Sequence, residues 1–190
     1  MGNSAVFFDR DGTLNIDPGY LGDPEQVRLF PGVSEAISKL KEKNFKIIVI
    51  SNQSGIARGL FTANEVEAVN LRINELLKTD NASVDAFYYC PYHPDFNTEE
   101  ECKCRKPSPM LVLKAASDLN IDLSSSYFVG DMLSDIECGK NAGLKTILLK
   151  NTLNEEQISS MLVEDRSPDF IAENLIEASK FIINDYSGGN

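Results

Sequence analysis

Short apolar runs alternate with amphipathic stretches along most of the chain. The runs are rich in β-branched and aromatic side chains, which is typical of buried strands; they lie at residues 5–8, 46–50, 85–89, 127–130 and 145–149. Between them, apolar residues recur every three or four positions, as in Val66, Val69 and Ile73, which predicts helices with one buried face. Alternating strands and helices predict a parallel sheet that is covered by helices on both faces.

Turn and capping residues set the expected boundaries. Pro31-Gly32 precedes a predicted helix, Thr62 to Glu65 is a capping box, and Gly143 ends a helix that begins at Ser134. We also expect a helix over 109–119 and closing helices over 154–163 and 174–183, followed by a frayed tail from Ser187 to Asn190. Two polar segments, 15–30 and 90–106, read as long loops.

Composition narrows the class of protein. The chain has 190 residues and 42% apolar content, which favours one globular domain over 1–190. Its net charge of −11 argues against nucleic acid as a partner. The longest apolar run falls well short of the roughly 20 residues of a membrane span. We therefore expect a cytoplasmic protein, a monomer, with a small molecule as its partner.

Two carboxylates come directly after the first predicted strand. Asp9 and Asp11 are one residue apart and precede Gly12-Thr13. Carboxyl ends of strands are where open α/β sheets bind ligands, and paired acids there favour a divalent cation and a carboxylate nucleophile beside a proton-transferring acid. A turn or a calcium loop is the alternative, but the residues after Thr13 lack the further oxygen ligands that such a loop needs.

Three later features fit the same chemistry. Ser51 ends the second strand, Lys106 follows Arg105 in a loop, and the fourth strand leads into Asp131 with Asp135 four residues later. Taken singly, these are explained as well by a polar loop, a solvated basic turn and a helix-capping acid. Their order along the chain favours a phosphoryl-transfer site.

This ordered set resembles the haloacid-dehalogenase-like phosphohydrolases over residues 5–150. The finer resemblance is to the branch that contains the heptose bisphosphate and histidinol phosphate phosphatases; it rests on residues 9–13, 52–59, 90–91 and 102–107. The resemblance implies a Rossmann-like, three-layer α/β/α fold with a central parallel sheet and the first strand in its middle. No segment is long enough to form a separate cap domain, so we expect an open active site that is shaped by loops 15–30 and 90–106.

The resemblance also implies a role for each site residue. Asp9 would be the nucleophile and Asp11 the general acid and base, while Ser51 and Lys106 would bind the transferring phosphoryl group. Mg²⁺ would be held by Asp9, Asp131 and the backbone carbonyl of Asp11. The implied substrate-binding residues are Asp17, Pro18, Gly19, Tyr20, Ser51, Asn52, Gln53, Ser54, Arg105 and Lys106. Asp135 would support the metal and orient Lys106. Met132 is a departure, because related enzymes often have Lys there.

Three cysteines lie close to the only histidine of the chain. Cys90, Cys102, Cys104 and His93 have the chemistry of a closed, structural Zn²⁺ site that would order the 90–106 loop. In the resembling enzymes, however, the ligand histidine lies two residues after the first cysteine, where this chain has Tyr92. Zinc with His93, a zinc-free loop and zinc with Asp95 as a replacement ligand therefore all stay open.

The expected function is that of a Mg²⁺-dependent phosphatase that forms an aspartyl-phosphate. Its expected substrate is a sugar bisphosphate, D-glycero-D-manno-heptose 1,7-bisphosphate, whose 7-phosphate is removed in the synthesis of nucleotide-activated heptose. Histidinol phosphate or another small phosphomonoester is the alternative substrate. An inactive binding protein is disfavoured, because none of the five motif residues is replaced; these are Asp9, Asp11, Ser51, Lys106 and Asp131.

Overall fold

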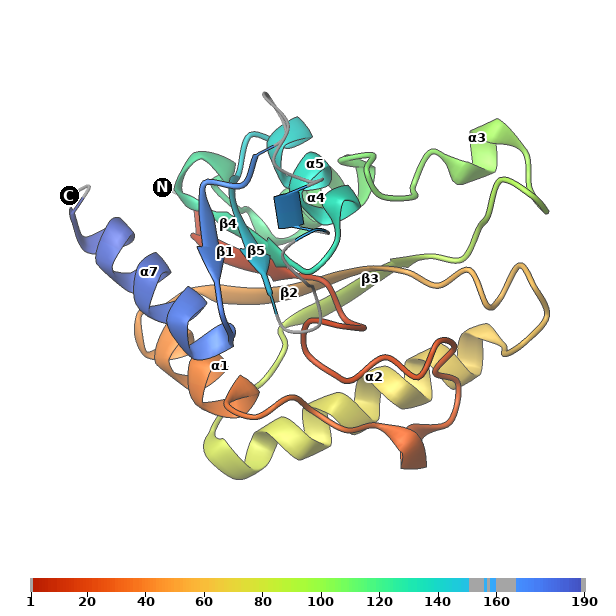
Figure 1. Cartoon of the computed structure of the whole chain (residues 1–190), viewed down its shortest axis with the longest axis horizontal. Coiled ribbons are helices and arrows are strands. Elements are labelled where there is room, and N and C mark those ends of the chain that lie inside the picture. The colour runs from red at the N-terminus through yellow and green to blue at the C-terminus, as the bar shows by residue number, and fades with distance from the viewer. Residues whose placement is uncertain (1, 151–155, 157, 160–166, 189–190) are drawn as a thin grey trace.

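A parallel six-stranded sheet forms the centre of the molecule (Figure 1). The computed structural model describes residues 2–150, 156, 158–159 and 167–188. The strands are β1 (Ala5–Phe8), β2 (Lys46–Asn52), β3 (Ala86–Cys90), β4 (Tyr127–Gly130), β5 (Lys145–Leu149) and β6 (Phe170–Ala172). Their order is β3-β2-β1-β4-β5-β6, and every neighbouring pair is parallel. The predicted Rossmann-like sheet with a central first strand is confirmed.

Helices cover both faces of this sheet. The helices of the described residues are α1 (Val33–Glu42), α2 (Ala63–Leu77), α3 (Glu99–Cys102), α4 (Met110–Leu119), α5 (Leu133–Asn141) and α7 (Leu175–Gly188), with short 3₁₀ turns η1 (Pro24–Gln26), η2 (Lys78–Asp80) and η3 (Leu123–Ser125); α3 lies apart from the sheet, in the loop after β3. Figure 1 shows α1 and α2 on one side of the sheet and α4 and α5 on the other.

Alternate residues of β1 belong to two separate cores. Val6 and Phe8 pack with buried residues of α1, α2 and α7, whereas Ala5 and Phe7 pack with those of α4 and α5. Side chains of a strand point alternately to its two faces, so a strand that is covered on both sides reads as a continuous apolar run. This is why the first strand could be predicted from four residues, and it confirms the three-layer arrangement.

Local signals account for most boundaries, with corrections near the C-terminus. The Thr62 capping box is present at the start of α2. β6 is absent from the prediction, because three residues are too few to show a period. α7 continues to Gly188, past the predicted end at 183, so the predicted fraying of Ser187 and Gly188 is wrong; Tyr186 extends the buried face by packing on Phe45. Of the predicted helix over 154–163, only residues 156, 158 and 159 lie within the described chain.

The two long loops lie at the predicted active site. Residues 9–32 follow β1 and residues 91–109 follow β3, and within them only η1 and α3 are helical. No helix among the described residues is long and apolar enough to cross a membrane. Because no described element forms a separate cap over β1, the site at its end is shaped by loops, as predicted.

Candidate active site

Three acidic residues and one lysine meet at the carboxyl ends of β1 and β4. Carboxylate oxygens of Asp9, Asp131 and Asp135 all lie within 4.8 Å of one another. The Nζ atom of Lys106 lies 2.5 Å from Asp9 Oδ1 and 2.7 Å from Asp135 Oδ1. All four side chains are buried. The structure thus brings together three residues of the predicted catalytic and magnesium set, together with Asp135.

A glycine makes this close approach possible. Gly12 has φ +86°, and a Cβ atom there would lie 2.3 Å from Asp131 Oδ2. The next residue, Thr13, donates its hydroxyl to Asp131 Oδ1 at 3.0 Å. Any other residue at position 12 would be strained in this left-handed conformation and would displace the Asp131 carboxylate.

The three buried carboxylates of this cluster repel one another, and Lys106 is the cation that faces them. Burial raises the pKa of Asp9 well above its ordinary value, and Asp135 and Asp131 add to the effect while Lys106 opposes it. Burial, helped by Asp135, also raises the pKa of Asp131 to about 6. For Lys106, burial disfavours the ammonium, but Asp135 and Asp9 outweigh it and raise its pKa. A single ammonium does not neutralise three carboxylates, so the cluster has the charge and the donor atoms for a divalent cation.

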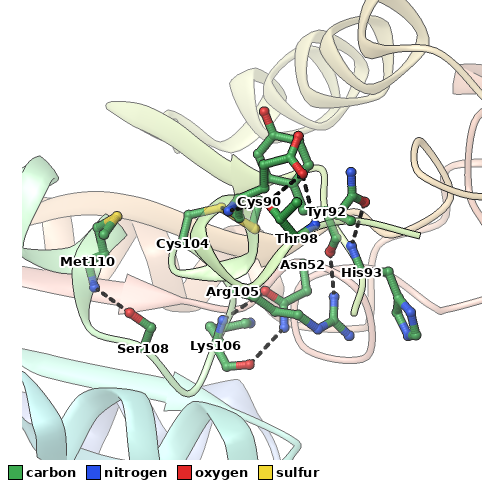
Figure 2. The surroundings of a disulfide bond; sticks show 12 residues. Asn52, Cys90, Tyr92, His93, Thr98, Cys104, Arg105, Lys106, Ser108 and Met110 are labelled. Carbon is green, nitrogen blue, oxygen red and sulfur yellow. Dashed lines mark hydrogen bonds between the residues drawn. A yellow bond between two sulfur atoms is a disulfide. The ribbon is translucent and has the colours of Figure 1, made fainter. Parts of the chain in front are cut away.

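Asn52 fixes the backbone of Lys106. Its Oδ1 accepts the Lys106 N–H at 3.0 Å, and its Nδ2 donates to the Lys106 carbonyl at 3.3 Å (Figure 2). This pair of bonds attaches the loop after β3 to the end of β2. Asn52 was predicted to bind substrate; the structure gives its amide this second task, which a sequence pattern could not reveal because it depends on a contact 54 residues away.

The neighbouring Arg105 is a half-buried cation at the edge of the site. It donates through Nη1 to the carbonyl of Tyr92 at 3.3 Å, as Figure 2 shows. Among the residues that the structure describes, it has no carboxylate in an ion pair, unlike Lys106. Its guanidinium is therefore available for an anionic ligand.

A cavity of about 270 Å³ is lined by most of the residues that are predicted to bind substrate. Predicted residues in its wall are Asp9, Asp11, Asp17, Gly19, Tyr20, Asn52, Gln53, Ser54, Arg105, Lys106 and Asp131. Pro18 and Ser51 are not in the wall; Ser51 is buried behind it and accepts a hydrogen bond from Gln53 Nε2 at 3.2 Å. Phe61, Met132 and Ser134 also line the cavity. Met132 stands out in the sequence as a departure from related enzymes. Nothing in the sequence around Phe61 indicates that its side chain lines the cavity.

The predicted zinc ligands do not fit the structure. Cys90 and Cys104 are joined by a disulfide, with their Cα atoms 5.5 Å apart (Figure 2), and Cys102 is a free cysteine. The imidazole of His93 has Arg58 Nη2 3.1 Å from its Nε2, and its Nδ1 accepts the Asp95 N–H at 3.2 Å. Thiols in a disulfide are not thiolate ligands, and a guanidinium beside Nε2 repels a cation. In the structure a covalent Cys90–Cys104 link holds the loop and the His93 imidazole contacts Arg58 and Asp95, so zinc is not shown at these residues.

Comparisons with known proteins identify phosphatases as relatives of this chain. A family model described as "HAD-hyrolase-like" matches residues 103–178. The D-glycero-D-manno-heptose-1,7-bisphosphate 7-phosphatase of Chlorobaculum tepidum is 43% identical over 183 residues, which cover 92% of this chain and 91% of the relative. The D-glycero-β-D-manno-heptose-1,7-bisphosphate 7-phosphatase of Escherichia coli K12 is 40% identical over 151 residues, 78% of this chain and 79% of that protein.

Solved structures give the same result. The crystal structure of D,D-heptose 1,7-bisphosphate phosphatase from B. bronchiseptica, complexed with magnesium and phosphate, superposes with a TM-score of 0.84 at 26% identity and covers 96% of this chain and 99% of that one. A putative HAD-like phosphatase from Mesorhizobium loti gives a TM-score of 0.80 at 32% identity, with 98% and 85% covered. The ordered motifs, the carboxylate cluster and the near full-length similarity lead to one conclusion: this chain belongs to the haloacid-dehalogenase-like phosphatases, in the branch of the heptose bisphosphate phosphatases.

Proposed function

We propose that this protein is a Mg²⁺-dependent phosphatase that removes the 7-phosphate of D-glycero-D-manno-heptose 1,7-bisphosphate. The observation that carries the proposal is the pairing of Asp9 with Lys106 inside a cluster of three carboxylates, at one end of a cavity that reaches Arg105. The names of the relatives above support this substrate. That the whole chain, 1–190, acts as one domain and as a monomer stays a prediction.

The cluster fits Mg²⁺ by its donor atoms. We assign the side chains of Asp9 and Asp131 and the backbone carbonyl of Asp11 as the protein ligands, since hard oxygen donors are what this ion prefers. When bound, the ion would offset the repulsion between an anionic nucleophile and an anionic phosphate. Asp135 is assigned a supporting role, because its Oδ1 is paired with Lys106 and its Oδ2 accepts the Met132 N–H at 3.0 Å.

The chain's own residues account for the steps of the reaction. Asp9 attacks phosphorus and becomes an aspartyl-phosphate, while Asp11 protonates the leaving alkoxide and then takes a proton from the water that hydrolyses the intermediate. Ser51 and Lys106 donate to the transferring phosphoryl oxygens, where negative charge must be stabilised. Asn52 supports this role of Lys106 by fixing its backbone.

The part of the cavity wall that Arg105 forms is suited to a second phosphate. Arg105 offers a guanidinium without a carboxylate partner among the described residues. The turn at Asp17 to Tyr20, which also contributes to the cavity wall, is fixed by the Gly19 N–H, which donates to Asp17 Oδ1 at 2.7 Å. A bisphosphate can place one phosphate at Asp9 and the other at Arg105, and contacts to the remote phosphate help to position the reacting one.

Phosphate release across a panel of substrates tests the proposal. With Mg²⁺, we expect heptose 1,7-bisphosphate to be hydrolysed with a higher kcat/KM than sugar monophosphates and than histidinol phosphate. Histidinol phosphate lacks the second phosphate and carries a cation that Arg105 would repel. Faster hydrolysis of histidinol phosphate would establish the alternative substrate, and the absence of any phosphate release would refute the enzyme class.

A further inference from the structure

Arg10 is a fully buried arginine between the two predicted catalytic acids. Burying a guanidinium is costly unless its donors are paired, so the partners show where its free energy is compensated. Arg10 donates from Nε and Nη2 to Asp11 Oδ2 at 3.1 and 2.9 Å, and from Nη2 to Gln53 Oε1 at 2.9 Å. Its Nη1 donates to Asn70 Oδ1 on α2 at 3.2 Å. Arg10 thus connects the Asp11 carboxylate to the end of β2 and to a helix.

The carboxylate of Asp11 is held from both sides. Besides Arg10, its Oδ2 accepts Gln53 Nε2 at 2.9 Å, whereas Asn15 Nδ2, also at 2.9 Å, is the one donor to its Oδ1 among the residues that the structure describes. Asp11 nevertheless lines the cavity, and its side chain is 20% exposed. A carboxylate oxygen has two lone pairs, so Oδ2 is saturated by three donors while Oδ1 keeps acceptor capacity.

Gln53 extends this arrangement to the phosphoryl-binding residues. Its Nε2 also donates to Ser51 Oγ at 3.2 Å, and its side chain is buried. Gln53 was expected to bind substrate, yet its amide oxygen and nitrogen are both engaged by protein groups. The Gln53 amide therefore hydrogen-bonds both the Asp11 carboxylate and the Ser51 hydroxyl.

We propose that Arg10 and Gln53, assisted by Asn15, are positioning residues that hold Asp11 so that its Oδ1 exchanges the proton in the reaction. The inference rests on the proposed function, in which Asp11 serves the leaving group and the attacking water. In this proposal Arg10 and Gln53 contact neither the attacking oxygen of Asp9 nor the phosphorus; they act through Asp11. Loss of Arg10 should therefore affect the steps that need a proton transfer and spare the attack by Asp9, whereas loss of Gln53 should also disturb Ser51.

A pair of substrates separates these steps. The sugar alkoxide of heptose 1,7-bisphosphate needs a proton to leave, whereas p-nitrophenolate leaves p-nitrophenyl phosphate without one. We expect Arg10→Lys to lower kcat on the bisphosphate by about 10- to 100-fold, a substantial part of a typical general acid–base contribution. Asn70→Ala, which removes the acceptor of Arg10 Nη1, should cause a smaller loss of the same kind. The first-turnover release of p-nitrophenolate, which reports attack by Asp9, should keep its rate within about threefold. Asn70→Ala still tests the proposal if Arg10→Lys does not fold.

Two controls exclude a merely structural effect. Asn74→Ala removes another amide of α2, one that bonds Val84 N and O away from the site; it should lower the melting temperature but leave the ratio of the two rates unchanged. In an Asp11→Asn background, Arg10→Lys should cause no further loss, because residues that act through one group are not additive. Equal losses on both substrates, or losses that multiply in the double variant, would overturn the proposal. Wild-type-like turnover in Asp9→Asn would instead overturn the proposed function itself.

Discussion

Replacing Arg105 with alanine should remove the preference for a bisphosphate. The guanidinium is half-buried, lines the same cavity as Asp9, and has a carbonyl as its hydrogen-bond partner. A charge-assisted hydrogen bond contributes about 1.5–3 kcal/mol, and a two-point contact in this partly solvated position about 2–4 kcal/mol. At about 1.4 kcal/mol for each factor of ten, the expected loss in kcat/KM is roughly 30- to 1,000-fold.

The assay compares heptose 1,7-bisphosphate with heptose 7-phosphate, which lacks the remote phosphate. Arg105→Ala should lower kcat/KM on the bisphosphate by that factor and change it by less than about threefold on the monophosphate. Arg105→Lys should restore part of the loss, since an ammonium keeps the charge but not the two-point geometry. Arg72→Ala, which removes an exposed arginine paired with Glu75 on α2, is the matched control. An equal loss on both substrates would show that Arg105 does not bind the remote phosphate.

Three further predictions follow from the site. Asp9→Asn keeps the size of the side chain but removes the nucleophile, so turnover should fall by several orders of magnitude; steady-state kinetics would contradict this if activity stayed near that of the wild type. Without metal the pKa of Asp131 is raised to about 6, so a proton occupies this carboxylate as pH falls through 6 and Mg²⁺ must displace it; titration calorimetry should show the Kd for Mg²⁺ rising by roughly tenfold per pH unit below 6, and a flat profile would be the contrary result. The disulfide leaves Cys102 and Cys138 free, so thiol titration of unreduced, unfolded protein should find two thiols per chain and elemental analysis little zinc; four thiols with about one zinc would restore the zinc interpretation.

The sequence predicted the fold because buried parallel strands have a strong local signature. Residues Ile47 to Ile50 are fully buried, as their unbroken apolar character predicted. The motif acids could be predicted as a cluster because carboxyl ends of parallel strands meet at one edge. β6 and the last turns of α7 depend on packing against distant elements, such as Phe181 stacked on Phe170, and have no local signal.

Hydrogen bonds between residues of the site could not be predicted from the sequence. Nothing in the sequence distinguishes an amide that binds substrate from one that fixes the backbone of Lys106, as Asn52 does. A charged residue such as Arg10 is expected at the surface, and only its three-dimensional partners explain its burial. The zinc expectation rested on counting ligand types in one loop, whereas ligation also requires that they converge, and His93 instead faces Arg58.

The most direct test of the account is to identify which phosphate ester is cleaved. Heptose 1,7-bisphosphate would be incubated with the enzyme and Mg²⁺, and the products followed by ³¹P NMR. The account predicts loss of the 7-phosphate signal, appearance of inorganic phosphate and an intact 1-phosphate, with no change for Asp9→Asn. Release of the 1-phosphate, or no release from this substrate, would contradict it.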